Sequence, residues 1–428
     1  MMSVKETIEY DCPCCGSTLR FDAGTQQVIC EYCGSAFDPL DHLMSEKDAE
    51  LSSDSVNVAN DGGNMMSDED LADMGDFSCG TCGAQLYTEK TTSATVCPFC
   101  GNSIILKGRM NGSLMPDRVI PFKKTKEQAL EALERHCRKR FVTKGFIESN
   151  RLDEIKGVYV PYWVYSADLD ADMTYTAVKE RTILIGKNED LVERKYYRVR
   201  RSGSISFDHV PADASCSMPD DLMESLEPFD NGGSVDFKTS YLSGYLANRY
   251  DVPQEDVKPI IERRMTTSAD NLFKKTVQGY NDVYLSSSDI RPAASSVDYY
   301  LYPVWLFNLS WEEKRYVFAM NGQTGKVAGN LPLDKSKLLA VTIATFFLLI
   351  LGMWAITGCD VRSDEIGDFL GWAIVISGLV SCCVYGYFSS MLNSVETRTD
   401  SDEYYREGSI QVDESSEEYL YKKLEMSR

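Results

Sequence analysis

Two copies of one cysteine motif constrain this chain more than any other feature. Each copy reads CxxCG and then CxxCG, with fourteen residues between its second and third cysteines. The second copy begins 67 residues after the first, and Leu86 and Val96 repeat Leu19 and Ile29. The eight motif cysteines are Cys12, Cys15, Cys30, Cys33, Cys79, Cys82, Cys97 and Cys100. The pattern predicts an internal repeat of a small cysteine-rich unit.

The spacing indicates metal binding. A CxxC turn places two sulfur atoms on one side of a tight turn, and the glycine after it permits a positive φ. Two facing turns complete a tetrahedron of thiolates, a donor set typical of zinc, with iron as the alternative. Four protein ligands leave no open position, so we predict two structural zinc ions, one per unit. Each unit is too small for an apolar core, so metal binding, worth about 10–16 kcal/mol, is expected to drive its folding.

Cys14 lies between two predicted ligands. The repeat and the position of Gly16 favour Cys12 and Cys15 as ligands and leave Cys14 unbound. Residues 1–11 contain acidic side chains and no apolar run of the kind a signal peptide needs. We therefore expect the N-terminal half to lie in a reducing cytosol, where paired cysteines indicate metal sites rather than disulfides.

The overall charge disfavours one class of partner. The chain has 428 residues and a formal net charge of −21. Its length predicts more than one domain. An acidic chain repels phosphate backbones, and nucleic-acid-binding proteins usually present a basic face. Binding to nucleic acid is therefore disfavoured.

Two uncharged apolar runs, residues 338–357 and 369–388, follow the polar part of the chain. About 20 helical residues cover the roughly 30 Å hydrocarbon core of a bilayer, so we predict a transmembrane hairpin. A buried core helix is the alternative. The connecting loop carries Arg362 among four acidic residues, whereas Lys335, Lys337, Arg398 and Arg406 flank the two runs. The positive-inside rule predicts that both termini are cytoplasmic.

Composition divides the chain into eight segments. These are zinc ribbon 1 (10–37), an acidic flexible linker (38–76), zinc ribbon 2 (77–107), an α+β cytoplasmic domain (116–332), transmembrane helix 1 (338–357), an extracytoplasmic loop (358–368), transmembrane helix 2 (369–388) and an acidic cytoplasmic tail (391–428). The fold class is therefore multidomain: two small β-type zinc ribbons, an α+β domain and a two-helix membrane hairpin.

The α+β domain shows a second repeat. Helices are expected over 125–141, with Thr125 as the N-cap, and over about 254–280. Each precedes strand-like sequence, and Pro161 and Trp163 match Pro303 and Trp305. We predict an internal duplication. Residues 157–178 are expected to form two strands joined by an acidic turn, and 321–326 a turn between strands.

No arrangement of residues indicates catalysis. The chain has three histidines, and none forms a recognisable pair with a nucleophile. Asp168, Asp170 and Asp172 are compatible with a calcium site, but a solvated face is favoured. Cys382 and Cys383 are interpreted as small residues of a membrane helix. We predict no catalytic residue and no cofactor besides zinc.

The order of these features resembles a known family. Two CxxCG units precede PYW (161–163), LYPVW (301–305) and FAMNGQTGKVAGNLP (318–332), and a hairpin follows. This order resembles the YdjG-like bacterial membrane proteins described as "TFIIB-type zinc ribbon-containing", nearly up to the end of the second run. The resemblance implies a multi-pass protein of the bacterial cell membrane that acts in membrane scaffolding. It also implies SPFH-domain (flotillin-like), TPM-domain or PspA-like partners. The acidic linker and tail depart from the family pattern.

We therefore expect a non-enzymatic adaptor or scaffold that presents a protein-binding module at the membrane. One alternative is a membrane-tethered nucleic-acid-binding zinc-ribbon protein, but the ribbons carry few Lys or Arg. A second alternative is an accessory subunit of a membrane enzyme or transporter, although the two spans contain no ionisable residue.

Overall fold

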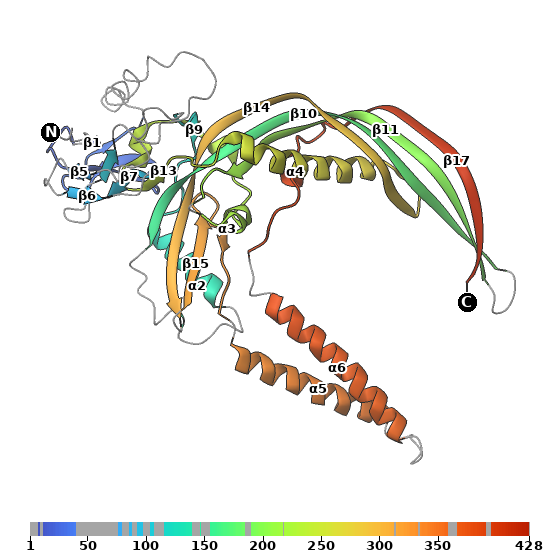
Figure 1. The fold of residues 1–428 in the computed structure, drawn as a ribbon. Coiled ribbons are helices and arrows are strands. Elements are labelled where there is room, and N and C mark those ends of the chain that lie inside the picture. Colours follow the sequence, from blue (N-terminus) through green and yellow to red (C-terminus); the bar gives the residue numbers. More distant parts are fainter. Residues whose placement is uncertain are drawn as a thin grey trace.

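The computed structural model describes residues 7–8, 12–39, 76–78, 85–87, 92–96, 103–106, 115–138, 146, 155–184, 190–216, 218–311, 314–332, 334–357, 366–390 and 395–427. A long, curved sheet dominates the molecule, with one long helix on its concave side and an apolar helical hairpin below (Figure 1). Most of the predicted linker and the cysteines of the second unit lie outside the described residues.

The helices and strands follow the chain in this order. The strands are β1 (Thr7–Ile8), β2 (Leu19–Asp22), β3 (Gln27–Cys30), β4 (Ala36–Phe37), β5 (Asp76–Ser78), β6 (Gln85–Tyr87), β7 (Thr92–Val96), β8 (Ser103–Leu106), β9 (Arg118–Val119), β10 (Lys156–Leu184), β11 (Asp190–Asp213), β12 (Val235–Asp236), β13 (Leu246–Asn248), β14 (Asp282–Trp311), β15 (Lys314–Asn321), β16 (Val327–Ala328) and β17 (Gln411–Ser427). The helices are α2 (Lys126–Cys137), α3 (Asp220–Ser225), α4 (Gln254–Lys275), α5 (Lys335–Thr357) and α6 (Ile366–Ser390), with 3₁₀ turns η2 (Asn231–Gly233), η3 (Thr239–Leu242) and η4 (Asp402–Tyr404).

The curved sheet is built on four long antiparallel strands in the order β17–β11–β10–β14. Strand β10 runs without interruption for 29 residues. The prediction of two strands joined by an acidic turn at Asp168–Asp172 is therefore wrong. Because side chains alternate between faces, these acidic residues share the solvent face while the apolar residues between them are buried. On that face, Asp172 accepts from Arg200 at 2.8 Å and Asp168 accepts from Ser206 at 2.6 Å.

Helix α4 covers the concave face of the sheet. Its apolar stripe includes the buried residues Ile261, Met265 and Phe273. The Tyr165 and Tyr175 hydroxyls of β10 donate to backbone oxygens near the two ends of the helix, at 2.8 and 3.4 Å. The predicted helix over 254–280 is confirmed as α4, which ends at Lys275.

Helix α2 begins where the sequence predicts. Thr125 is its N-cap and forms a capping box with Gln128: the Thr125 hydroxyl accepts from the Gln128 backbone N–H, and the Gln128 side chain accepts from the Thr125 backbone N–H. The predicted turn over 321–326 is also present, since it joins β15 to β16.

The segments of the predicted duplication make corresponding contacts, and the duplication itself stays a prediction. Strand β9, before α2, pairs in parallel with β14, and β13, before α4, pairs in parallel with β10. The Trp163 indole donates to the Val252 carbonyl at 2.8 Å, and the Trp305 indole donates to the Lys124 carbonyl at 2.9 Å. Each carbonyl lies one residue before the N-cap of the other repeat's helix. Each half therefore supports the other through the same contacts.

The segment after the hairpin rejoins the folded domain. Strand β17 pairs with β11 from Asp190 to Ser204, so much of the predicted acidic tail forms an edge strand of the sheet. Its charges are tolerated because an edge strand exposes both faces and one side to water. Several of these charges have partners, as in the Arg198–Glu418 ion pair at 3.0 Å.

A buried ion pair holds this returning segment. The Arg264 guanidinium contacts the Glu227 carboxylate at 2.7 and 3.2 Å, and their side chains are 2% and 1% exposed. The Tyr404 hydroxyl donates to the same carboxylate at 3.0 Å, and the Arg398 guanidinium donates to the Glu227 carbonyl at 3.1 Å. Arg264 also donates to the Asp400 carbonyl at 3.1 Å. Helix α4, the turn after α3 and the segment after the hairpin therefore meet at Glu227.

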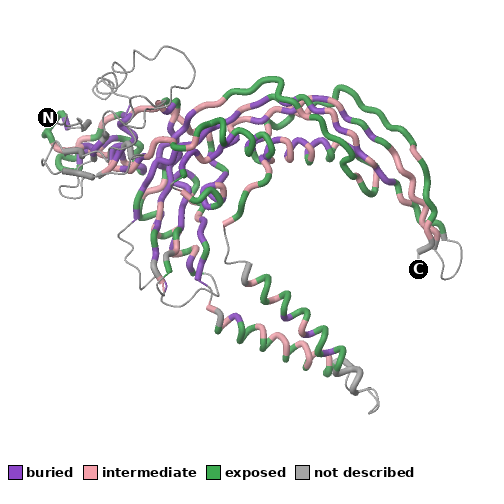
Figure 2. Tube along the Cα trace, viewed as in Figure 1, coloured by how far each residue is buried: buried purple, intermediate pink, exposed green. Residues whose placement is uncertain are grey.

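Helices α5 and α6 pack as an apolar hairpin. Within them, Ser336–Ala355 and Gly371–Phe388 are long and apolar enough to cross a membrane. On α6, the small residues Ala373, Ser377 and Ser381 are buried. Small side chains at this spacing allow close approach between membrane helices. Large apolar side chains on both helices are exposed, among them Phe347 and Leu379. Figure 2 shows exposed and half-buried residues along both helices.

We expect Glu227→Gln to destabilise the protein by about 3–5 kcal/mol, because it leaves the buried Arg264 guanidinium without its counter-charge. Chemical unfolding of the full chain in detergent micelles checks this. Asp289→Asn, in the exposed pair with Arg291, is the control and should leave the unfolding midpoint unchanged. Equal midpoints for Glu227→Gln and the unchanged chain would contradict this role of the pair.

Candidate metal centre

The first cysteine unit is a three-stranded sheet, β2–β3–β4, with two matching turns. In the first turn the Gly16 N–H donates to the Cys12 carbonyl at 2.7 Å, and in the second the Gly34 N–H donates to the Cys30 carbonyl at 2.9 Å. Both glycines have φ of +73°, which favours glycine over residues with a Cβ. The predicted need for glycine at this position is confirmed in both turns.

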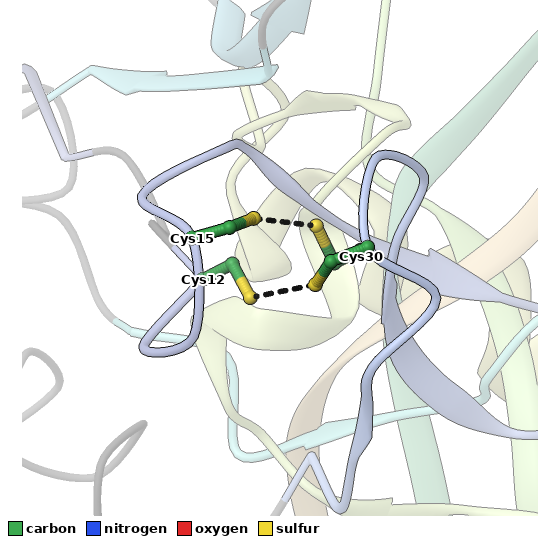
Figure 3. A group of neighbouring side chains, drawn as sticks. Cys12, Cys15 and Cys30 are labelled. Atoms are coloured by element: carbon green, nitrogen blue, oxygen red, sulfur yellow. Dashed lines mark hydrogen bonds between the residues drawn. The ribbon is translucent and has the colours of Figure 1, made fainter.

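The turns bring four sulfur atoms together (Figure 3). The sulfur atoms of Cys12, Cys15, Cys30 and Cys33 all lie within 4.8 Å of one another. The Cys12–Cys33 and Cys15–Cys30 separations are both 3.5 Å. Tetrahedral ligands at about 2.3 Å from a metal lie about 3.8 Å apart. A disulfide needs about 2.05 Å, and all four cysteines are free. The cluster therefore fits one metal ion.

The remaining predicted ligands are not placed. Cys79, Cys82, Cys97 and Cys100 lie outside the described residues, so a second metal ion stays a prediction. In the sequence, Cys97 and Cys100 fall between strands β7 and β8, and Cys33 falls likewise between β3 and β4. Cys14 is exposed and lies outside the cluster, as predicted.

The thiols of the cluster differ in acidity. Hydrogen bonds with the side chain and backbone of Ser35 lower the pKa of Cys33 to about 6. The backbone bond with Ser17 lowers the pKa of Cys15, but desolvation and the neighbouring thiols outweigh it and raise this pKa to about 12. Desolvation also raises the pKa of Cys12. Four thiolates this close repel one another, and a bound cation would remove that repulsion.

The first unit docks against the sheet domain. The Gln26 side chain donates to the Phe122 carbonyl at 2.7 Å, and the Phe21 N–H donates to the Ser243 carbonyl at 3.0 Å. The rings of Phe21 and Tyr241 lie 5.1 Å apart, edge to face. Sequence reasoning missed this contact, because only the fold brings residues 21–39 beside residues 240–245.

A groove of about 730 Å³ lies between the first unit and the sheet domain. Its lining mixes charges of both signs, including Arg20 and Glu31 from the cysteine unit and Glu127 and Lys156 from the domain. Arg20 and Glu31 form an ion pair at 3.1 Å. The groove also contains apolar side chains such as Ile29 and Trp305, and this mixture of charged and apolar groups suits an extended polypeptide segment.

We expect Cys30→Ser/Cys33→Ser to lose one metal ion per chain, because two oxygen donors cannot replace two thiolates in this tetrahedron. Elemental analysis of the purified full chain measures this. Cys14→Ser is the control, since it removes a neighbouring thiol outside the cluster. Cys97→Ser/Cys100→Ser tests the second predicted site and should also lose one ion. Unchanged metal content in Cys30→Ser/Cys33→Ser would show that the first cluster binds no metal.

After the metal is removed, we expect Cys33 to be the first thiol of the cluster to react with iodoacetamide. Its thiolate forms as the pH rises through about 6, whereas thiols with raised pKa values stay protonated at neutral pH. Mass spectrometry of alkylation against pH follows each cysteine. Ser35→Ala should move the Cys33 midpoint to higher pH. An unmoved midpoint would mean that Ser35 does not stabilise the thiolate.

Comparison with known proteins identifies a relative of this chain. No family model matches it, and no solved structure matches it. It is 33% identical over 335 residues to the uncharacterized protein YdjG of Bacillus subtilis (strain 168), an alignment that covers 78% of this chain and 92% of YdjG. This chain therefore belongs to the same family as YdjG.

Proposed function

We propose that this protein is a membrane-anchored zinc-ribbon adaptor that presents a protein-binding module in the cytoplasm. The observation that carries the proposal is the closed cysteine cluster: its four sulfur atoms lie within 4.8 Å of one another, which leaves no position for a substrate on the metal. A closed site of this kind stabilises a surface rather than carrying out chemistry. We accordingly assign the protein no catalytic role.

The metal in this proposal is zinc, with two ions per chain. Zinc accepts four thiolates in a tetrahedron, and it has no redox chemistry that would need protection. The second ion would be bound by Cys79, Cys82, Cys97 and Cys100, the repeat of the first unit. We also attribute the exchanged Trp163 and Trp305 contacts to an internal duplication of the α+β domain.

The proposed topology is a hairpin in the bacterial cell membrane with both termini cytoplasmic. Residues on both sides of α5–α6 belong to one folded unit, through the β11–β17 pairing and the contacts of Glu227 with Arg398 and Tyr404. A hairpin that left the two ends on opposite sides would break this unit. The cations that flank the hairpin favour the cytoplasmic side.

The proposed partner is a protein, and the groove between the first unit and the domain is its proposed binding site. The groove offers both acidic and basic side chains, so an extended segment with mixed charges suits it. The family resemblance suggests SPFH-domain, TPM-domain or PspA-like proteins as the first candidates.

Capture from native membranes tests the proposal. We expect the tagged full chain, solubilised in mild detergent after crosslinking, to retain a specific protein. Cys30→Ser/Cys33→Ser should lose that protein while still fractionating with membranes, because the metal supports one wall of the groove. Cys14→Ser should retain it. Quantitative mass spectrometry compares the three, and equal recovery of all proteins in all three samples would count against an adaptor that uses this site.

A further inference from the structure

The concave face of the sheet continues beyond the end of α4. Helix α4 ends at Lys275, whereas β10, β11 and β17 run on toward the C-terminal end of the sheet (Figure 1). Figure 2 shows that burial decreases along these strands toward that end. Side chains near that end are exposed, including Ile183 at 37% and Leu424 at 52%, so the sheet presents an uncovered surface there.

Strand register identifies the residues of this surface. Tyr175 contacts α4, so the odd-numbered residues after it on β10 share the concave face. Lys179 is one of them: its amine lies 4.6 Å from the centre of the Tyr280 ring and 5.2 Å from that of Tyr197. Tyr197 in turn contacts Tyr419 of β17, edge to face at 5.6 Å. The three strands therefore contribute to one continuous face.

The face combines cations with exposed apolar and aromatic side chains. We call it the concave tip. Its members, all exposed or half-buried, are Lys179, Arg181, Ile183, Lys195, Tyr197, Tyr280, Tyr419, Lys422 and Leu424.

Acidic side chains on this face are already neutralised. Glu193 is 12% exposed and lies 3.6 Å from both Lys195 and Lys422. Glu417 accepts from the Tyr280 hydroxyl at 2.9 Å and lies 3.4 Å from Arg201. The concave tip is therefore locally basic, although the whole chain has a net charge of −21.

We propose that the concave tip binds the anionic headgroups of the bilayer that holds α5 and α6. Lysine and arginine attract anionic lipid, tyrosine favours the headgroup region, and leucine and isoleucine enter the boundary with the acyl chains. The hairpin lies on the concave side of the sheet, so this face is directed toward the hairpin's side of the molecule (Figure 1). A nucleic acid would use the cations but would leave Ile183 and Leu424 without an apolar partner.

This inference rests on the proposed membrane anchoring, and the two can fail separately. Incorporation of the full chain into lipid nanodiscs tests the anchoring. If the purified discs contained none of the protein, the proposed anchoring would be overturned. The concave tip is tested only in discs that contain the protein.

Photocrosslinking then reports what the concave tip touches. The photoreactive residue p-benzoylphenylalanine replaces Leu424 in one variant and Tyr421 in another. The two positions lie three residues apart on β17 and are similarly exposed, at 52% and 54%. Register pairs Leu424 with Glu193 on the concave face and Tyr421 with Tyr196 on the opposite face. We expect several-fold more lipid adduct from position 424, and only in discs that contain phosphatidylglycerol besides phosphatidylcholine.

Charge removal supplies the matched comparison. Lys195→Gln/Lys422→Gln removes one cross-strand pair on the concave face, and Arg194→Gln/Lys423→Gln removes the adjacent pair on the other face. The first variant should lose the phosphatidylglycerol-dependent adduct severalfold, and the second should keep it. Equal loss in both variants, adducts to a second copy of the chain, or suppression of lipid adduct formation by DNA added before irradiation would overturn the proposal.

Discussion

Strand β10 runs for 29 residues in two different environments: residues 157–165 are continuously buried, and apolar and polar residues then alternate from Ser166 to Ala177. The apolar residues at odd positions from Trp163 to Ala177 are buried in the cluster that contains the α4 side chains, and the polar residues between Ser166 and Thr176 reach water. From Tyr162 to Val178 the strand lies between β11 and β14, so its backbone groups are paired on both sides. Strand β10 also pairs with β13, so the sheet, helix α4 and the connection to the cysteine unit all take their positions from this one strand.

The ion pair of Glu227 and Arg264 holds the segment that follows the hairpin against the domain. The chain leaves the domain at α5 and rejoins it after α6, so the segment after α6 needs contacts that bind it to the domain. A buried carboxylate that binds Arg264 and Tyr404, with a carbonyl that binds Arg398, fastens it at a single residue. Burying these charges costs free energy unless each one is paired. The site therefore favours the one arrangement in which the carboxylate and the guanidinium meet. It couples the position of the hairpin to α4 and hence to the sheet.

The cysteine cluster lies at the other end of the molecule from the concave tip (Figure 1). If the concave tip binds the bilayer, the domain would be held at two places, the hairpin and the sheet end. The first cysteine unit would then be displayed at a fixed distance from the membrane. In the proposed adaptor, the docked cysteine unit at the far end of the sheet would set where a partner is held.

The sequence by itself determined the local features. The apolar runs form helices α5 and α6, the two CxxCG motifs of the first unit form matching turns with Gly16 and Gly34 at positive φ, and Thr125 caps α2. These depend on periodicity, turn chemistry and capping within a few residues. The alternation of apolar and polar residues from Ser166 to Ala177 also indicated a continuous β10 strand, although the three acidic residues within it suggested a turn.

Only the tertiary structure decided the long-range pairings. The acidic segment after residue 410 becomes β17 because β11 offers it a complementary edge, and its composition alone resembles a solvated tail. Glu227 and Arg264 are 37 residues apart, and the cysteine unit meets the domain across more than 200 residues at Ser243 and Leu19. Local sequence cannot specify such partners, because their energy comes from desolvation and packing that exist only once the distant segments have met.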